Sequence, residues 1–217
     1  MNGALHELYY YGFSVLLFCF LWFQTIPAVK VEGDDAVTWG SVIKLVHQST
    51  GYRLHSHEIV YGTGSGQQSV TAYPFGGDNN SFWRVKRQEK ANNESNCSPV
   101  ACGSWLRLEH LTTRKNLHSH LPKSPLSGNL EVSAFGIAGQ GDSGDVFQLV
   151  CNDYSTKYWK RGEGVYFKHV DTNAFLYSSM KYVYPEPIEG HLEVSGHKKK
   201  NSDCLWKADD GFYLRRD

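Results

Sequence analysis

An internal repeat restricts the folds open to this chain more than any other feature of its sequence. Residues 40–47 (GSVIKLVH) align with residues 103–110 (GSWLRLEH), and a weaker third copy places Val165, Phe167 and His169 in the same register. Further along each copy, residues 66–70, 128–132 and 190–194 all begin with glycine and end with valine. Anchors that recur three times in the same order indicate three copies of one structural unit.

Each copy contains four short strand-like runs, separated by Gly, Asn, Asp or Pro. In residues 41–46 the alternation places Ile43 and Leu45 on one face, and residues 52–57 form a second run. A four-stranded unit of about 60 residues cannot bury its own apolar face, so the copies must share one core. We predict an all-β fold, a β-trefoil of three pseudo-threefold repeats over residues 36–217 (repeats 37–95, 100–157 and 160–217), with an open β-sandwich as the alternative.

The N-terminus resembles a secretory signal peptide. Residues 12–23 carry no charge, but they are too few to cross a hydrocarbon core of about 30 Å. Ala28 is a small residue of the kind that precedes a cleavage site, so we predict a signal peptide over residues 1–28. The segment lacks the usual Lys or Arg near its start, and an uncleaved anchor is the alternative. No later stretch is apolar enough to span a bilayer, so a lumenal or secreted protein is expected.

The charge balance excludes one class of partner. The chain has 22 Lys and Arg against 22 Asp and Glu, whereas binding to nucleic acid by counterion release needs a basic face. Nucleic acid is therefore not an expected partner.

Loss of the leader would leave four cysteines in an oxidising compartment, where disulfides are expected. The simplest pair is Cys97–Cys102, which leaves the pairing of Cys151 and Cys204 open. Because those two stand alone, the spacing disfavours a zinc site, and we predict no metal and no cofactor. Asn79 and Asn93 begin glycosylation sequons.

Three strings resemble one known family. Residues 54–57 (LHSH), 62–70 (GTGSGQQSV) and 127–136 (SGNLEVSAFG) are similar to the stromal cell-derived factor 2 family, and the resemblance runs from about Val37 to Leu214. Members are built from three MIR motifs, a module shared with protein O-mannosyltransferases and with inositol-trisphosphate and ryanodine receptors. The resemblance implies a β-trefoil in the endoplasmic reticulum (ER) lumen. It also implies an adaptor that acts with DnaJ-type co-chaperones and the chaperone BiP on misfolded or O-mannosylated clients.

The C-terminus departs from that family. Relatives commonly end in a retrieval signal similar to His-Asp-Glu-Leu, whereas this chain ends at Arg215-Arg216-Asp217. Secretion as a cytokine-like trefoil is therefore an alternative to residence in the ER.

The histidines form two sets. His47, His110 and His169 recur in all three copies and are predicted to be structural. The pairs His55/His57 and His118/His120 have the i, i+2 spacing that places two rings on one strand face, which also suits a metal. No supporting ligand is spaced nearby, and the third copy has Tyr177 and Ser179 instead, so repeat architecture is favoured over ligand recognition.

No enzyme motif is evident. The glycine-rich residues 62–66 lack the Lys-Ser/Thr end of a phosphate loop, and no G-x-S-x-G elbow is present. Glu131 and Glu193 occupy equivalent repeat positions, which would lie too far apart for a two-carboxylate glycosidase. We therefore predict a non-enzymatic protein.

Binding is what remains, and a lectin-like glycan module is the alternative to the adaptor. Trefoils often bind sugars with an aromatic platform and nearby amides, for which Tyr61, Tyr73 and Tyr184 are available. The candidate positions for binding a ligand or partner are His55, His57, Gln67, Gln68, His118, His120, Asn129 and Phe135.

Overall fold

Every strand of the fold belongs to one of three sets of four, and each set follows the same plan. The computed structural model describes residues 35–88 and 97–215, so the predicted leader (1–28) and Asn93 lie outside the described residues. The first set is β1 (Val42–His47), β2 (Arg53–Val60), β3 (Gln68–Tyr73) and β4 (Phe82–Arg87). The second is β5 (Trp105–His110), β6 (Asn116–Lys123), β7 (Leu130–Phe135) and β8 (Phe147–Cys151). The third is β9 (Gly164–His169), β10 (Phe175–Val183), β11 (Leu192–His197) and β12 (Trp206–Phe212).

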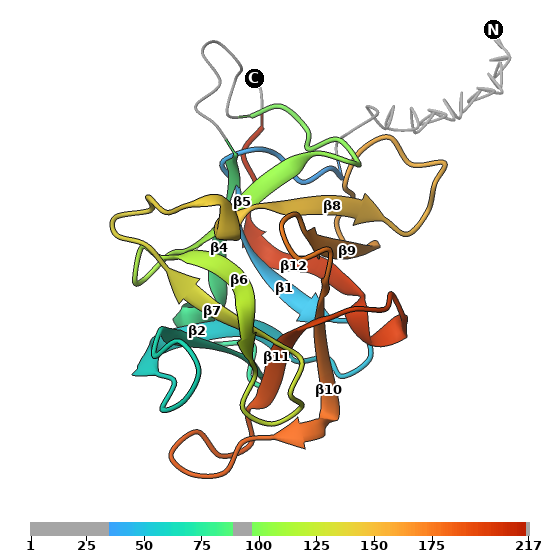
Figure 1. The fold of residues 1–217 in the computed structure, drawn as a ribbon. Helices are drawn as coiled ribbons and strands as arrows, with labels where there is room; N and C mark the ends of the chain where they lie inside the picture. Colours follow the sequence, from blue (N-terminus) through green and yellow to red (C-terminus); the bar gives the residue numbers. More distant parts are fainter. Residues whose placement is uncertain (1–34, 89–96, 216–217) are drawn as a thin grey trace, which may run out of the picture. The chain divides into compact units, whose positions relative to one another are not determined.

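The outer strands of the three sets close into a six-stranded barrel. Around the ring, β1 pairs with β4, β4 with β5, β5 with β8, β8 with β9, β9 with β12 and β12 with β1. The inner strands form the hairpins β2–β3, β6–β7 and β10–β11, and β3, β7 and β11 pair with one another. In Figure 1 the hairpin strands β2, β10 and β11 lie in the lower half of the view, whereas the barrel strands β4, β5 and β8 lie in the upper half. The predicted β-trefoil is confirmed.

The core repeats in the same threefold way. Ile43 and Leu45 are both fully buried, as their shared strand face predicts. Their equivalents in the other sets are buried as well, and each set adds a large ring to the core, in Trp83, Phe147 and Trp206. All three sets therefore contribute to one main apolar core, beside which Tyr166, Tyr177 and Cys204 form a small second cluster.

A short 3-10 turn precedes the last strand of each set. The turns are η1 (Asn79–Ser81), η2 (Ser143–Asp145) and η3 (Ser202–Cys204), and each begins after a side chain, from Asp78, Asp142 or Asn201, that accepts a backbone N–H. Within residues 35–88 and 97–215, no helix has the length and apolar character needed to span a membrane.

A buried histidine joins each turn to the next set of strands. The Nε2 of His110 lies 2.9 Å from the carbonyl oxygen of Asn80 in η1, and its Nδ1 lies 2.9 Å from Thr113 Oγ1. A carbonyl can only accept, so Nε2 carries the proton and donates it. His47 and His169 make the same contacts, to Asp203 and Thr50 and to Gly144 and Thr172 respectively, at 2.8–2.9 Å. We call these three residues the clasp histidines, and their predicted structural role is confirmed.

The predicted Cys97–Cys102 disulfide is wrong, because Cys102 pairs with Cys151 instead. Cys102 precedes β5 and Cys151 ends β8, and the pairing of these strands brings the two Cα atoms to 5.6 Å. Between Cys97 and Cys102, Pro99 forms a β-bridge with Thr38 and Ala101 forms one with Tyr158.

We expect peptide mapping of the unreduced protein to recover the Cys102–Cys151 cross-link. The bond joins residues 49 apart in the sequence, so replacing both cysteines by alanine should lower the free energy of unfolding by about 2–4 kcal/mol. Recovery of a Cys97–Cys102 peptide would contradict the observed pairing of β5 with β8.

We also expect acid to weaken the fold through the clasp histidines. Burial lowers the pKa of His47, His110 and His169 below the ordinary imidazole value. Below about pH 6.5 the unfolded chain therefore binds protons that the folded chain does not, and stability falls by at most about 1.4 kcal/mol per pH unit for each ring. Urea unfolding at pH 7 and pH 5 measures this loss.

The matched variant is His110→Gln, which should be less stable at pH 7 but should show a shallower dependence on pH. A dependence as steep as that of the unchanged protein would mean that His110 is not held neutral.

Candidate functional site

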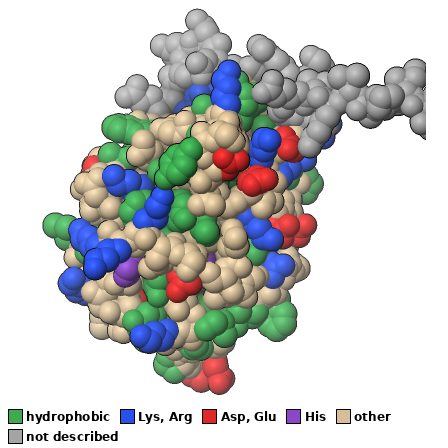
Figure 2. All heavy atoms as spheres, turned by 90° about the vertical axis from the view of Figure 1, so that its right-hand side faces the viewer, with side chains coloured by type: hydrophobic (Ala, Val, Ile, Leu, Met, Phe, Trp, Pro, Cys, Tyr) green, Lys and Arg blue, Asp and Glu red, His purple; other side chains and the backbone are tan. Residues whose placement is uncertain are grey.

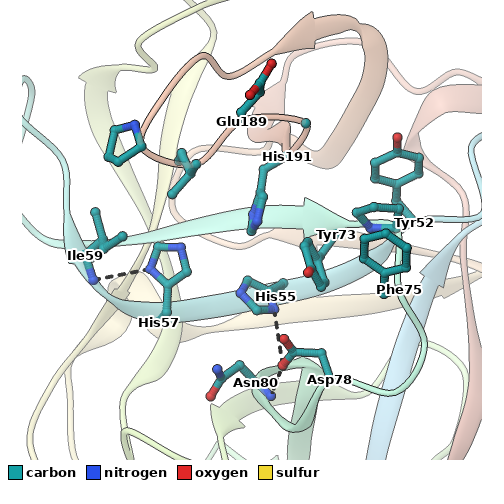
Figure 3. A pocket seen from close by; sticks show the side chains of 14 residues that line it. Tyr52, His55, His57, Ile59, Tyr73, Phe75, Asp78, Asn80, Glu189 and His191 are labelled. Atoms are coloured by element: carbon teal, nitrogen blue, oxygen red, sulfur yellow. Dashed lines mark hydrogen bonds and ion pairs between the residues drawn. The ribbon is translucent and has the colours of Figure 1, made fainter.

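A pocket of about 580 Å³ lies where the first hairpin meets the segment that leads into β11. We call it the first-unit pocket. Strand β2 contributes His55 and His57, the end of β3 contributes Tyr73, Asp78 lies just before η1, and His191 immediately precedes β11 (Figure 3). Its walls therefore come from the first and third sets of strands.

The three imidazole rings lie close together at the centre of this pocket (Figure 3). His55 and His57 point to the same side of β2 because side chains two residues apart share a strand face, and their ring centroids are 5.3 Å apart. The centroid of His191 lies 5.2 Å from that of His55, 5.9 Å from that of His57 and 4.5 Å from that of Tyr73.

Each ring is oriented by one of its two nitrogens. Nδ1 of His55 lies 3.4 Å from Ser81 Oγ and 3.9 Å from a carboxylate oxygen of Asp78. Nδ1 of His57 accepts the backbone N–H of Ile59 at 3.2 Å. Nδ1 of His191 lies 2.9 Å from Thr71 Oγ1. On this arrangement the second nitrogen of each ring is available to the pocket.

Burial keeps these rings neutral. It lowers the pKa of His55 to about 3 and that of His191 to about 4, and it lowers the pKa of His57 as well. The carboxylate of Asp78 opposes the shift, while the neighbouring rings reinforce it in His55 and His191. At neutral pH the pocket therefore presents uncharged imidazoles.

A second-unit pocket of about 540 Å³ surrounds His118 and His120, but there the rings are bound to carboxylates. Nδ1 of His118 lies 3.0 Å from the fully buried Asp145, which occupies the repeat position of Ser81. Nε2 of His120 lies 2.9 Å from the fully buried Glu131. The two pockets are equivalent in place but different in chemistry.

Buried glutamates also explain why the two pockets differ. The carboxylate of Glu131 accepts the backbone N–H and the hydroxyl of Ser65 in the glycine-rich turn 62–66, and Glu193 accepts Leu126 N at 2.6 Å in the corresponding turn of the second set. The first set has Ser69 at this position, and its hydroxyl donates to the carbonyl of Ile59. In each case the glutamate holds the turn of the preceding set, so Ser69 corresponds to the turn of the third set, residues 185–190. Within the described residues that turn lacks a glutamate contact of this kind, and it borders the first-unit pocket.

The amides and Phe135 that the sequence suggested as ligands lie at structural contacts. Gln67 borders the second-unit pocket, but its Oε1 already accepts the hydroxyl of Ser133 at 2.6 Å. Gln68 is 2% exposed and donates to two hydroxyls, so no surface of it is open to a ligand. Asn129 donates to Ser195 Oγ at 3.1 Å, and the ring of Phe135 packs on His118. These positions remain untested as binding residues.

Two tyrosines suggested as a sugar platform are buried. The hydroxyl of Tyr61 donates to the carbonyls of Val70 and Val132, and Tyr184 is buried nearby. Of the suggested aromatics, Tyr73 borders the first-unit pocket, and the strongly exposed Phe75 lies beside it at 5.4 Å between centroids.

The structure adds His191 and Asp78, which the sequence analysis did not single out. His191 occupies the repeat position of Gln67 and Asn129. Gln67 contacts a hydroxyl of the second hairpin, Asn129 one of the third, and His191 one of the first. Because β11 pairs with β3, this position in the third set lies against the first hairpin. The repeat alignment together with the trefoil pairing could therefore have placed His191 beside His55.

The chain matches one family over most of its length, the MIR domain, across residues 54–207. It is 42% identical over 212 residues to a stromal cell-derived factor 2-like protein of Dictyostelium discoideum, with 93% of this chain and 97% of that protein covered. It is 46% identical over 192 residues to the Arabidopsis thaliana protein of the same name, with 88% and 87% covered.

Solved structures agree with these matches. The crystal structure of the Arabidopsis thaliana protein superposes with a TM-score of 0.79 at 45% identity and covers 83% of this chain and 98% of that chain. A protein O-mannosyltransferase complex of S. cerevisiae, bound to its sugar donor, gives a TM-score of 0.74 at 27% identity, with 82% of this chain but 26% of that chain covered. The identity to these relatives extends along nearly the whole chain, and the repeat and the barrel agree with it. The chain therefore belongs to the stromal cell-derived factor 2 family and carries a MIR domain.

Proposed function

We propose that this chain is a non-enzymatic adaptor of the ER lumen that joins a DnaJ-type co-chaperone and BiP in the quality control of misfolded or O-mannosylated proteins. The observation that carries this proposal is membership of the stromal cell-derived factor 2 family over nearly the whole chain. An ER-related role is also in keeping with a domain that resembles part of an O-mannosyltransferase.

The described surface offers a place for a protein partner. Large apolar side chains are exposed where the hairpins turn, at Ile59 and Val60 on β2, Leu121 on β6, and Met180 and Val183 on β10. Figure 2 shows apolar atoms near the lower end of the molecule, where the β10–β11 hairpin lies in Figure 1. Contiguous exposed apolar patches mark interaction sites, and these five side chains are the candidates for one.

The buried acidic groups support a binding role over a catalytic one. Glu131 and Glu193 each hold a turn of a different set of strands through several hydrogen bonds, so their carboxylate oxygens are engaged in structural contacts. The first-unit pocket is lined by imidazoles, aromatic rings and the carboxylate of Asp78, which suit recognition.

A glycan-binding role is the second candidate, and the first-unit pocket favours it. The faces of Tyr73 and Phe75 lie beside His55 and Asp78, a combination of aromatic surface and hydrogen-bonding groups that suits a sugar. Calorimetric titration with mannose tests it directly, and Phe75→Ala should weaken any binding by about tenfold or more. Heat signals that Phe75→Ala leaves unchanged would exclude this pocket.

The adaptor is tested by affinity capture from ER lumenal extract, with and without free mannose. We expect recovery of a DnaJ-type co-chaperone and BiP in stoichiometric amounts, unaffected by mannose. The double substitution Leu121→Asp with Met180→Asp should abolish recovery, because it places two charges on the apolar hairpin ends.

The matched control is Ile137→Asp, because Ile137 is also strongly exposed but lies in the turn after β7. Its recovery of both chaperones should equal that of the unchanged chain. Recovery of glycoproteins alone, released by mannose, would contradict the adaptor and support the glycan module. Export of the intact chain into the medium would support the cytokine-like alternative.

A further inference from the structure

The first-unit pocket brings together three histidines from two distant parts of the chain. His55 and His57 share a face of β2, and His55 pairs across the hairpin with Thr71 on β3. His191 arrives from the third set of strands, because Leu192 on β11 pairs with Ala72 on β3. One ring nitrogen from each of the three residues lies within 4.8 Å of the other two.

The ring nitrogens of His55 and His191 are divided in the way that a metal site needs, whereas in His57 the division is reversed because Nδ1 accepts the Ile59 N–H. Protein groups orient Nδ1 of each ring through Ser81 and Asp78, through Ile59 N–H, and through Thr71. Imidazoles that bind metals donate their other N–H to such a partner, a contact that Asp78 or Ser81 can make with His55 and that Thr71 can make with His191. On His57 the Nε2 atom is buried and has no hydrogen-bond partner within the described part of the protein.

We propose that His55, His57 and His191 bind a divalent transition-metal ion, with Zn²⁺ the best match, and that solvent or a further ligand completes its coordination. Three neutral imidazoles are a known ligand set for zinc, and an open fourth position is usual where three protein ligands bind. The pocket is open to solvent on one side, so the ion can enter and exchange.

Binding requires a small adjustment. In a tetrahedral zinc site with bonds of about 2.1 Å, the ligand nitrogens lie roughly 3.4 Å apart, so the present separation of up to 4.8 Å must close. His57 would turn and give up the bond from Ile59 N–H, since Nδ1 must then carry the proton. Ile59 is 43% exposed, so water can replace the lost acceptor.

The threefold relatives of this cluster lack the set. In the second-unit pocket Gln67 stands in place of His191, and His118 and His120 are bound to Asp145 and Glu131. In the third set the corresponding residues are Tyr177, Ser179 and Asn129. Among the described residues, only the junction of the third set with the first brings ring nitrogens of three imidazoles within 4.8 Å of one another.

The test titrates the full chain, purified without a polyhistidine tag and treated with chelator, with Co²⁺ alone. Co²⁺ occupies zinc sites and reports nitrogen coordination through its visible absorption. We expect visible bands at one ion per chain, displaced by Zn²⁺, and a higher Tm with Zn²⁺ present. His191→Gln, which gives the first-unit pocket the side chain of the second, should weaken binding by at least about tenfold.

His57→Gln removes a half-buried ligand and serves as a second variant in case His191→Gln does not fold, which the Tm without metal reports. His120→Gln is the matched control and should bind like the unchanged chain. The proposal is overturned by an absence of bands in excess Co²⁺, by bands that survive both His191→Gln and His57→Gln, or by bands that disappear in His120→Gln. These readouts do not involve chaperones or sugars, so the test of the metal site is independent of the test of the adaptor.

Discussion

The structure depends on a hydrogen bond from a buried imidazole to the carbonyl of a 3-10 turn, made three times. Each 3-10 turn points a carbonyl oxygen at the histidine, and for the buried Gly144 an unsatisfied acceptor would cost about 1–3 kcal/mol. Nε2–H of a clasp histidine satisfies it, while a threonine three residues later orients the ring. The ring also packs on Trp206, Trp83 or Phe147, so one side chain serves both core and turn.

The clasp positions everything around the pockets. Fixing η1 fixes Asp78 and Ser81, and these two residues in turn orient His55. The same chain of contacts in the second set runs through η2 to Asp145 and His118. Function therefore depends on where the copies differ. Where the first set has Ser81 the second has Asp145, so His55 contacts a hydroxyl and His118 a carboxylate. At another repeat position the first-unit pocket has His191 and the second-unit pocket has Gln67.

Much of the fold could be predicted from the sequence because repetition reveals tertiary structure. Three copies of one unit required a shared core, and the alternation at Ile43 and Leu45 placed both residues in it. The recurrence of His47, His110 and His169 indicated a structural role, since a residue kept in every copy serves the architecture rather than one site.

Less of the site could be predicted from the sequence, because the site depends on pairing between distant strands. Proximity in sequence favoured Cys97 as the partner of Cys102, but the β5–β8 ladder brings in Cys151. In the same way, the sequence placed no third histidine near His55 and His57, whereas the segment that leads into β11 brings His191 beside them from the far end of the chain. Composition and spacing do not report which strand edges meet.

The central claim is that buried, neutral clasp histidines hold the three copies together, and NMR of the histidine ring nitrogens tests it most directly. The account predicts that His47, His110 and His169 are neutral with the proton on Nε2 at pH 7. It predicts that they remain so at pH 6, where a free imidazole is mostly charged. Charged rings at pH 6, or a proton on Nδ1 at pH 7, would contradict it.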